Sequence, residues 1–157
     1  MFSGKPFSAL KVADAHELIN SRPPTVQKSA NLRNAIDALL AHPLSRAVYV
    51  IDTEGNLAGV VTVETLLKHV GYRAGVRENS AKAYIALLRD SLKDGVEQVM
   101  RRAKAVTEET PLKDVLFIML DEHVNDVPVV DDSYKLVGEL IGLEMITAAK
   151  DLFGSEP

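Results

Sequence analysis

The chain has 157 residues, of which 46% are hydrophobic and 25% are charged. This composition is typical of a folded globular domain and does not indicate a disordered or fibrous protein. A formal net charge of −4 argues against nucleic-acid binding, which needs a positive face to neutralise phosphates. Because there is no cysteine, disulfides, thiolate metal sites and cysteine nucleophiles are excluded.

We do not expect the start of the chain to be a secretion signal. Residues 1–6 contain one charged side chain and no apolar run, unlike a secretion signal. No apolar stretch approaches the roughly 20 residues that cross a bilayer. We therefore expect a cytoplasmic protein with no membrane partner.

The first set of predicted elements runs from residue 12 to residue 70. Helical turns over 12–19 and an extended segment at Thr25–Val26 come first. An amphipathic helix follows, with the spacing i, i+3, i+4, i+7 and i+8 at Leu32, Ala35, Ile36, Leu39 and Leu40. A strand over 47–52, a turn over 53–56 and a strand over 57–61 then precede a helix marked by Val63, Leu66, Leu67 and Val70.

A long connection follows this first set. Gly71–Asn79 has the composition of a turn, and Ser80–Leu92 predicts an additional helix with Ala81, Ile85 and Leu88 on one side. Gly95 suits the C-terminal cap of that helix.

The same elements then recur in the same order. Helical turns over 96–100 and an extended segment at Ala105–Val106 lead to Thr110 and Pro111, which suit a helix start. The helical stripe returns 80 residues after the first, at Leu112, Val115, Leu116, Met119 and Leu120. A strand over 126–131, a turn, a strand over 136–140 and a final helix lie 79 residues after their counterparts, which indicates a one-residue deletion. The sequence therefore contains two copies of one unit.

These two copies in register resemble the CBS domain family, whose members occur as tandem pairs. The most telling segments are Val127–Asp131 with Leu136–Gly138, and Asn56–Thr62 in the first copy. The resemblance implies an α/β (α+β) fold of two pseudo-twofold-related βαββα repeats packed through their sheets, with an extra linker helix. We expect repeat 1 over 12–70, the linker over 71–95 and repeat 2 over 96–150.

The resemblance also implies a function. Family members bind adenosine-type ligands in two related clefts at the junction of the repeats, and the pairs commonly dimerise. We therefore expect a homodimeric regulatory module that binds AMP, ADP, ATP or another adenosyl ligand, has no other cofactor, and acts on a regulated protein in trans. The alternative is a structural dimerisation module with no small-molecule ligand. An interaction adaptor acting through the 80–92 helix is compatible with either.

The ligand motif implied by the family follows the third strand of each repeat. It reads glycine, two apolar residues, serine or threonine, two variable residues and aspartate. The first copy keeps Thr62 but has Thr65 in place of the ribose carboxylate, while Glu64 lies one residue early, about 100° around the helix. The second copy has Ile141 in place of the hydroxyl and keeps an acid, Glu144. We therefore expect the second copy's site to be the occupied one.

The resemblance implies further lining residues in both copies. In the second copy they are Lys104, Ala105, Asp126, Val127 and Pro128, and in the first copy Pro24, Thr25, Arg46, Ala47 and Val48. Candidates for phosphate contacts are Arg22, Arg46 and Arg102. The alternatives are that these arginines are solvated surface residues and that Glu144 only complements the dipole of its helix.

The sequence gives no support to catalysis or metal binding. It has no phosphate loop, nucleophile elbow or dinucleotide fingerprint, so we do not expect an enzyme. His42, His69 and His123 fall in or just after the last turn of a predicted helix, where a cation favours the dipole, and we predict no metal. The basic cluster of Arg101, Arg102 and Lys104 is expected to be a solvated loop, with contact to a nucleotide phosphate as the second interpretation and to nucleic acid as the third.

Overall fold

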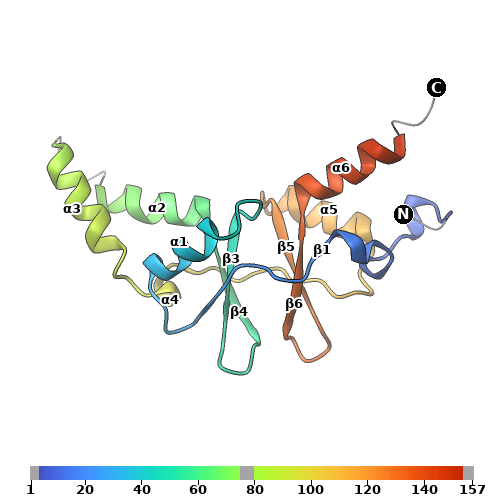
Figure 1. Cartoon of the computed structure of the whole chain (residues 1–157), viewed down its shortest axis with the longest axis horizontal. Helices are drawn as coiled ribbons and strands as arrows, with labels where there is room; N and C mark the ends of the chain where they lie inside the picture. The colour runs from blue at the N-terminus through green and yellow to red at the C-terminus, as the bar shows by residue number, and fades with distance from the viewer. Residues whose placement is uncertain (1–3, 75–79, 154–157) are drawn as a thin grey trace. The chain divides into compact units, whose positions relative to one another are not determined.

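The computed structural model describes the backbone of residues 4–74 and 80–153. Residues 1–3, 75–79 and 154–157, and the side chains of 72–74, 84 and 149–153, are not described. Two three-stranded sheets and their helices make up the described chain (Figure 1), which confirms the predicted α+β class. No helix in the described part of the chain is long and apolar enough to span a membrane.

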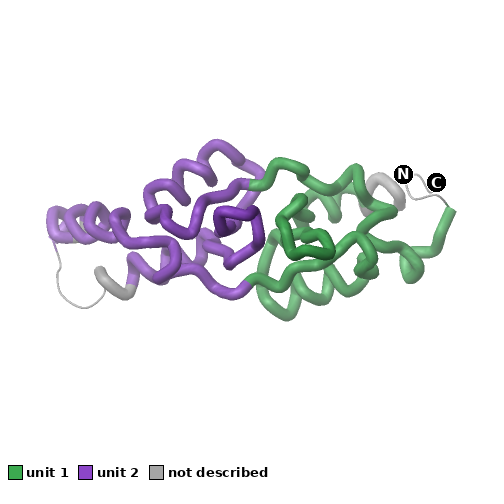
Figure 2. Tube along the Cα trace, turned by 90° about the horizontal axis from the view of Figure 1, so that it is seen from below, with its two compact units in different colours: residues 1–23, 103–157 green, residues 24–102 purple. Residues whose placement is uncertain are grey.

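The chain divides into two compact units (Figure 2). One unit consists of residues 24–102, and the other joins residues 1–23 to residues 103–157. The first 23 residues therefore pack with the second repeat, and the segment 96–102 packs with the first. The boundaries of the two units, after residues 23 and 102, therefore differ from those of the sequence repeats, 12–70 and 96–150.

In the unit of residues 24–102, a three-stranded sheet has the order β2 (Thr25–Gln27), β3 (Ala47–Ile51), β4 (Leu57–Thr62). Strand β2 is parallel to β3, and β3 is antiparallel to β4. Helix α1 (Leu32–Leu40) has the bounds of the predicted stripe, and α2 (Val63–Ala74) follows β4 directly. The core of this unit includes Leu32, Ala35, Val48, Val50, Val61 and Val96.

The linker of this unit holds the predicted additional helix, α3 (Ala81–Ser91), followed by α4 (Val96–Val99). The prediction for Gly95 is wrong: α3 is capped at Leu92, and Gly95 begins α4 with an ordinary φ of −70°. Residues 71–74 are the last turn of α2 and not the predicted turn, while residues 75–79 lie outside the described chain.

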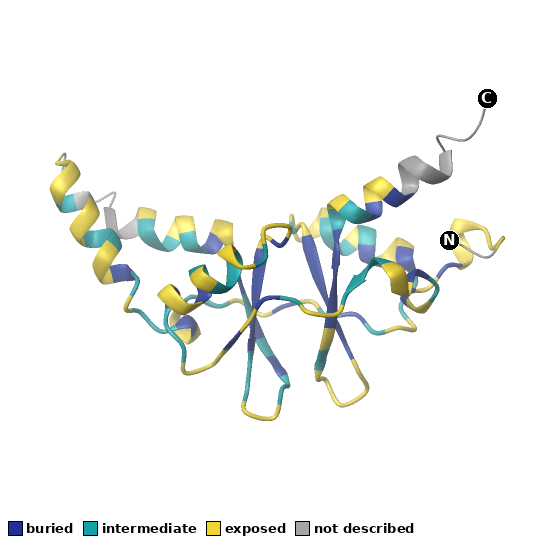
Figure 3. Cartoon of the chain, in the orientation of Figure 1, coloured by how far each residue is buried: buried dark blue, intermediate teal, exposed yellow. Residues whose placement is uncertain are grey.

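In the other unit, the sheet order is β1 (Ile19–Asn20), β6 (Leu136–Ile141), β5 (Asp126–Val130), all antiparallel. The predicted extended segment at Ala105–Val106 contributes one parallel bridge, from Val106 to Val129. Helices α5 (Leu112–Asp121) and α6 (Gly142–Phe153) pack on one face of this sheet. Burial concentrates in the strands of both units (Figure 3).

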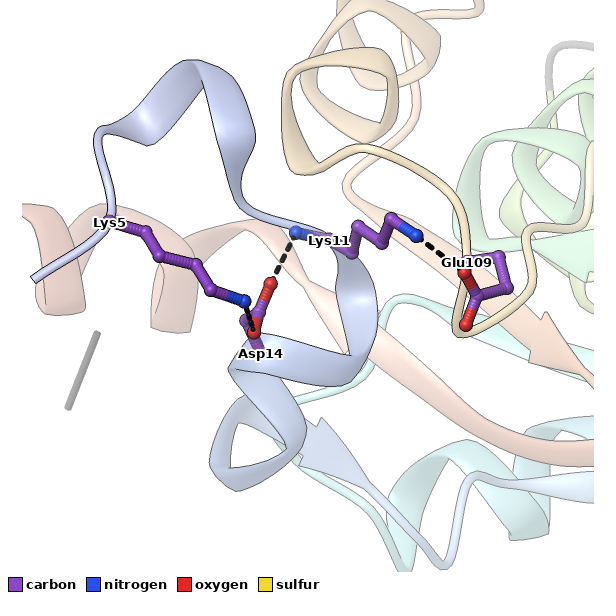
Figure 4. A network of polar contacts seen from close by, with 4 residues as sticks. All are labelled: Lys5, Lys11, Asp14 and Glu109. Carbon is purple, nitrogen blue, oxygen red and sulfur yellow. Dashed lines mark hydrogen bonds and ion pairs between the residues drawn. The ribbon is translucent and has the colours of Figure 1, made fainter. Parts of the chain in front are cut away.

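The N-terminal segment completes the core of this second unit. It forms the 3-10 helices η1 (Phe7–Ala9) and η2 (Val12–Leu18), and contributes Leu10, Val12 and Ala15 to the core around Leu112, Val115 and Leu140. Within this segment Lys5 pairs with Asp14 (2.8 Å), and an exposed ion pair from Lys11 to Glu109 (2.6 Å) joins the segment to the rest of the unit, as Figure 4 shows. The hydrogen bond to Glu109 raises the pKa of Lys11, and the bond from Lys5 lowers the pKa of Asp14.

The first amides of α1 and α5 are satisfied by distant backbone carbonyls. Leu112 N donates to Leu10 O, and Leu32 N donates to Asp94 O, both at 2.9 Å. The prediction that Thr110 caps α5 is therefore wrong: its hydroxyl accepts from Thr107 N at 3.1 Å, and Pro111 is the N-cap residue. In each unit, the cap comes from the segment that precedes the other repeat in sequence.

In both hairpins, an aspartate side chain accepts the backbone hydrogen bonds that hold the turn. Asp52 Oδ1 accepts from the amides of Glu54 and Asn56 at 2.9 Å, and Asp131 Oδ1 accepts equivalent amide bonds in the second copy. The bonds from Asn56 lower the pKa of Asp52. The left-handed position is Gly55 (φ 86°) in one turn and Tyr134 (φ 65°) in the other. The two copies therefore form the same turn with different residues.

Candidate functional site

The candidate residues of the second copy gather at one end of their sheet. Asp126, the first residue of β5, lies opposite Ile141, the last residue of β6. The bridge from Val106 to Val129 brings Lys104 and Ala105 beside the start of β5. Gly142 N donates to Asn125 O at 2.8 Å, which holds the start of α6 at the same place.

Glu144 lies in the first turn of α6, directly after this end of the sheet, and its side chain is half-buried. A carboxylate there can accept hydrogen bonds from two hydroxyl donors and also complements the helix dipole. Asp126 and Ile141 are buried, and Val127 belongs to the hydrophobic core. Val127 therefore offers a ligand only its backbone.

The candidates of the first copy gather in the equivalent place. Ala47 lies opposite Thr62, and Val63 N donates to Arg46 O at 3.1 Å. Thr25 pairs with Tyr49 in the parallel ladder, which brings β2 to the same end of the sheet. Val48 lies in the core and, like Val127, offers only its backbone.

The two threonines of the first copy bond to each other at the start of α2. Thr65 Oγ1 accepts from Thr62 N at 2.7 Å and donates to Thr62 O at 2.8 Å. Thr62 Oγ1 accepts from Thr65 N at 3.1 Å, which completes a reciprocal cap. Thr65 is only 7% exposed. Its hydroxyl is thus engaged within the protein at the position where the family motif has a carboxylate.

The two copies also differ at a backbone carbonyl beside the site. In the first copy, Tyr49 N donates to Pro24 O at 2.9 Å. The equivalent residues of the second copy are Pro128 and Lys104. Proline has no N–H, so the Lys104 carbonyl receives no hydrogen bond from position 128. The Lys104 carbonyl of the second copy therefore lacks the strand hydrogen bond that the Pro24 carbonyl accepts in the first copy.

Two of the basic side chains near the candidate sites, Lys104 and Arg46, bond to other groups of the protein. Lys104 Nζ pairs with Glu122 Oε1 at 2.6 Å, and this bond raises the pKa of Lys104. Arg46 Nη1 donates to Pro43 O at 2.7 Å and to Ser45 O at 3.1 Å. Arg22 and Arg102 are exposed and belong to different units.

Sequence reasoning missed a buried carboxylate in the second copy. Glu139, in β6, is fully buried, and Asn20 Nδ2 donates to its Oε1 at 2.9 Å. The equivalent residue of the first copy is Val60. The available signal was an acid at a strand position that is apolar in the other repeat.

The histidines lie close to where they were predicted, with one exception. His42 follows α1, with its Nδ1 2.8 Å from Ala38 O, and His123 follows α5 with φ 52°. His69 is not in the last turn, because α2 extends beyond it, and its Nε2 lies 2.7 Å from Asp94 Oδ2. Within residues 4–71 and 80–148, leaving out the side chain of residue 84, no group of three or more histidine, aspartate or glutamate side chains could hold a metal ion.

A comparison of the chain with models of protein families finds a match in both repeats. The model of the CBS domain matches residues 13–72 and 96–140. The chain belongs to the CBS domain family. Both matched segments contain the first helix and the strands of the hairpin, and the first also contains Thr62 and Thr65, while the second ends at residue 140, just before Ile141 and Glu144. A search of the curated proteins finds no match to the chain.

Solved CBS structures share this fold. A CBS domain-containing protein from Thermotoga maritima is 28% identical, with a TM-score of 0.70 over 88% of this chain and 93% of that one. The CBS domain pair of protein MJ0100, solved with 5′-methylthioadenosine and S-adenosyl-L-methionine, is 21% identical, with a TM-score of 0.67 over 89% and 99%. CBSX2, solved with AMP, is 22% identical, with a TM-score of 0.68 over 92% and 98%.

Proposed function

We propose that the chain is a non-catalytic regulatory module that binds an adenine nucleotide or another adenosine-containing metabolite. Two CBS pairs with the same fold were solved with such molecules, one with 5′-methylthioadenosine and S-adenosyl-L-methionine and one with AMP. The ligand would shift the packing of the repeats, and a regulated partner in trans would respond to that shift. The module would act as a homodimer.

The proposed site is the sheet end of the second copy, where β5 begins and α6 follows β6. The observation that carries this choice is the difference between the copies. Glu144 supplies a half-buried carboxylate for the ribose hydroxyls, and the Lys104 carbonyl can accept from the adenine amino group. In the first copy, the equivalent groups are bonded to Tyr49 and Thr62.

Two of the cations that could bind a phosphate, Lys104 and Arg46, are already bonded within the protein. In the unit that holds the proposed site, a phosphate could replace Glu122 as the partner of Lys104 or could bind Arg22, while Arg46 and Arg102 remain the candidates of the other unit. An adenosyl ligand without phosphate needs none of these exchanges. A comparison of AMP with 5′-methylthioadenosine therefore tests whether phosphate contributes to affinity.

A structural module without a ligand is the second candidate. The observation that favours it is that neither copy holds the complete family motif: Thr65 replaces the acid in one, and Ile141 replaces the hydroxyl in the other. In this reading, Glu144 only complements the dipole of α6.

A thermal-shift screen separates the two candidates. The compounds are AMP, ADP, ATP, NAD, S-adenosylmethionine and 5′-methylthioadenosine. A ligand at 100 times its dissociation constant adds about 2.7 kcal/mol to the free energy of unfolding if it binds only the folded state. No shift with any compound would favour the structural candidate.

The variant Glu144→Ala tests the site itself. We expect it to reduce the ligand-induced shift, because the acceptor for the ribose hydroxyls is lost. The matched control is Glu64→Ala, which removes an exposed acid from the first turn of α2, where Glu64 pairs with Lys68 at 2.6 Å. A shift that survives Glu144→Ala unchanged would contradict the proposed site and leave the fold untouched.

A further inference from the structure

The second copy has no side-chain hydroxyl at the point where α6 begins. Ile141, the last residue of β6, is 4% exposed and lies directly before Gly142, the first residue of α6. Its counterpart Thr62 carries a hydroxyl at the start of α2, where it accepts from Thr65 N at 3.1 Å. A hydroxyl at this place can donate to a phosphate oxygen, whereas an isoleucine side chain offers only apolar contact.

The positive end of α6 already has a carboxylate beside it. The N-terminus of a helix attracts phosphate because its first amides are unpaired and its dipole is positive there. Glu144 lies in the first turn of α6, and its half-buried carboxylate complements that dipole. A phosphate at the same place would stand close to this negative charge. The carboxylate therefore favours ribose hydroxyls as donors and disfavours a phosphate.

A cation of the first copy has a neutral counterpart in the second. Arg46 directly precedes β3, and its carbonyl accepts from Val63 N at the start of α2, at 3.1 Å. The Asn125 carbonyl accepts the equivalent bond from Gly142 N at 2.8 Å, so Asn125 is the structural counterpart of Arg46. The Asn125 side chain is exposed and uncharged. The second copy therefore has an amide group where the first has a guanidinium group.

The two basic candidates of the second copy's unit, Lys104 and Arg22, do not replace that charge. Lys104 Nζ lies 2.6 Å from Glu122 Oε1, so a phosphate brought to Lys104 also meets a carboxylate. Arg22 is exposed and follows β1, which runs antiparallel to β6 and so leads away from the end of the sheet where α6 begins. Neither residue therefore places an unshared positive charge at the start of α6.

We propose that the site of the second copy takes an adenosine compound without phosphate and discriminates against AMP, ADP and ATP. The proposal rests on the proposed function and narrows its class of ligand. A thioether at the ribose 5′ position, as in 5′-methylthioadenosine, needs neither a hydroxyl donor nor a cation. A sulfonium, as in S-adenosylmethionine, carries a positive charge that the Glu144 carboxylate attracts. A phosphate is held by charge-assisted hydrogen bonds, and the second copy lacks or offsets the groups that would donate them.

The dissociation constants of adenosine and AMP give the most direct comparison, because the two compounds differ only by the phosphate. Isothermal titration calorimetry of the full chain measures both at neutral pH and one fixed salt concentration, together with 5′-methylthioadenosine and S-adenosylmethionine. We expect AMP to bind about tenfold or more weakly than adenosine. At least one of the two sulfur compounds should bind as tightly as adenosine or more tightly.

Variants that bring the first copy's residues into the second test the cause of this preference. Asn125→Arg combined with Ile141→Thr should raise the affinity for AMP about tenfold or more and leave that for adenosine within about threefold. The matched control is Ser133→Arg, which adds the same charge in the exposed turn at the other end of the hairpin and should change neither affinity. Circular dichroism checks folding. Asn125 is exposed, so Asn125→Arg alone provides the test if the double variant is unfolded.

Each contrary result has a distinct meaning. Binding of AMP as tightly as adenosine, or of ADP or ATP alone, would overturn this proposal and leave the proposed function standing. An AMP affinity that ignores the Asn125→Arg variants, or that rises equally in Ser133→Arg, would overturn the selection against phosphate at the start of α6. Absence of binding by all four compounds, with no shift in the thermal screen, would remove the proposed function and this proposal with it.

Discussion

Replacing Thr65 by valine tests whether the Thr65 hydroxyl caps helix α2 or contacts a ligand. Valine keeps the shape of the side chain and removes only the hydroxyl, which bonds to Thr62 N at 2.7 Å and to Thr62 O at 2.8 Å. Thr65 is 7% exposed, so water would replace these bonds poorly. Loss of a buried hydrogen-bonding partner costs about 1–3 kcal/mol. At about 2–4 °C per kcal/mol for a chain of this size, a loss near 2 kcal/mol lowers Tm by about 4–8 °C.

The assay is thermal unfolding followed by far-UV circular dichroism, with Thr147→Val as the matched control. Thr147 is exposed on α6, and its hydroxyl donates to Leu143 O at 2.8 Å. A surface change of this kind stays within about 0.5 kcal/mol. Equal Tm values for the two variants would refute the capping role. A Thr65→Val protein with unchanged Tm and a lost nucleotide response would instead make Thr65 a ligand contact.

The left-handed turn positions give a paired prediction: Tyr134→Gly should stabilise the chain by about 1 kcal/mol and Gly55→Ala should destabilise it similarly, because non-glycine residues are strained there. Denaturant midpoints measure both, and a lowered midpoint for Tyr134→Gly would contradict the strain argument. Asn20→Ala should cost about 1–3 kcal/mol by removing the amide that bonds buried Glu139, and a change below about 0.5 kcal/mol would show that this bond contributes little. The lowered pKa of Asp52 means that its contribution to stability is complete above the unfolded pKa of about 3.9 and is lost as pH falls through the lower folded value. An NMR titration of that carboxyl group at or above 3.8 would contradict the hydrogen bonds of the turn.

The sequence predicted the elements that depend on local apolar periodicity. The stripe from Leu32 to Leu40 became α1 with the same bounds, and the strand pairs of both repeats were placed within one or two residues. These elements form because their apolar side chains must be buried on one face, and the spacing of those side chains can be read within one short stretch of sequence. The repeat made the prediction of these elements stronger, because the same order and spacing of apolar residues occurs in both copies.

The features that the sequence did not predict depend on partners far along the chain. Thr110 looked like a helix cap, but Leu10 supplies the carbonyl that bonds the first amide of α5. Gly95 looked like a helix end, but its segment pairs with Asn31 at the start of α1. The pairing of β1 with β6 joins residues more than 100 positions apart. No local pattern records such contacts, since backbone carbonyls and amides are present at every residue.

The candidate site shows the same division. The family motif identified Thr62, Thr65, Ile141 and Glu144 as the positions to compare, and the fold brings each set to one end of its sheet. What the motif could not show is which groups are already bonded within the protein. The reciprocal bonds of the threonines and the missing N–H of Pro128 emerge only from the geometry.

Isothermal titration calorimetry of the purified chain with AMP and with S-adenosylmethionine tests the central claim most directly. We predict saturable binding of at least one of them at one ligand per chain, weakened about tenfold or more by Glu144→Ala and unchanged by Glu64→Ala. Absence of binding by both compounds, or equal affinity in the Glu144→Ala protein, would contradict the account of the second copy as the site of an adenosine ligand.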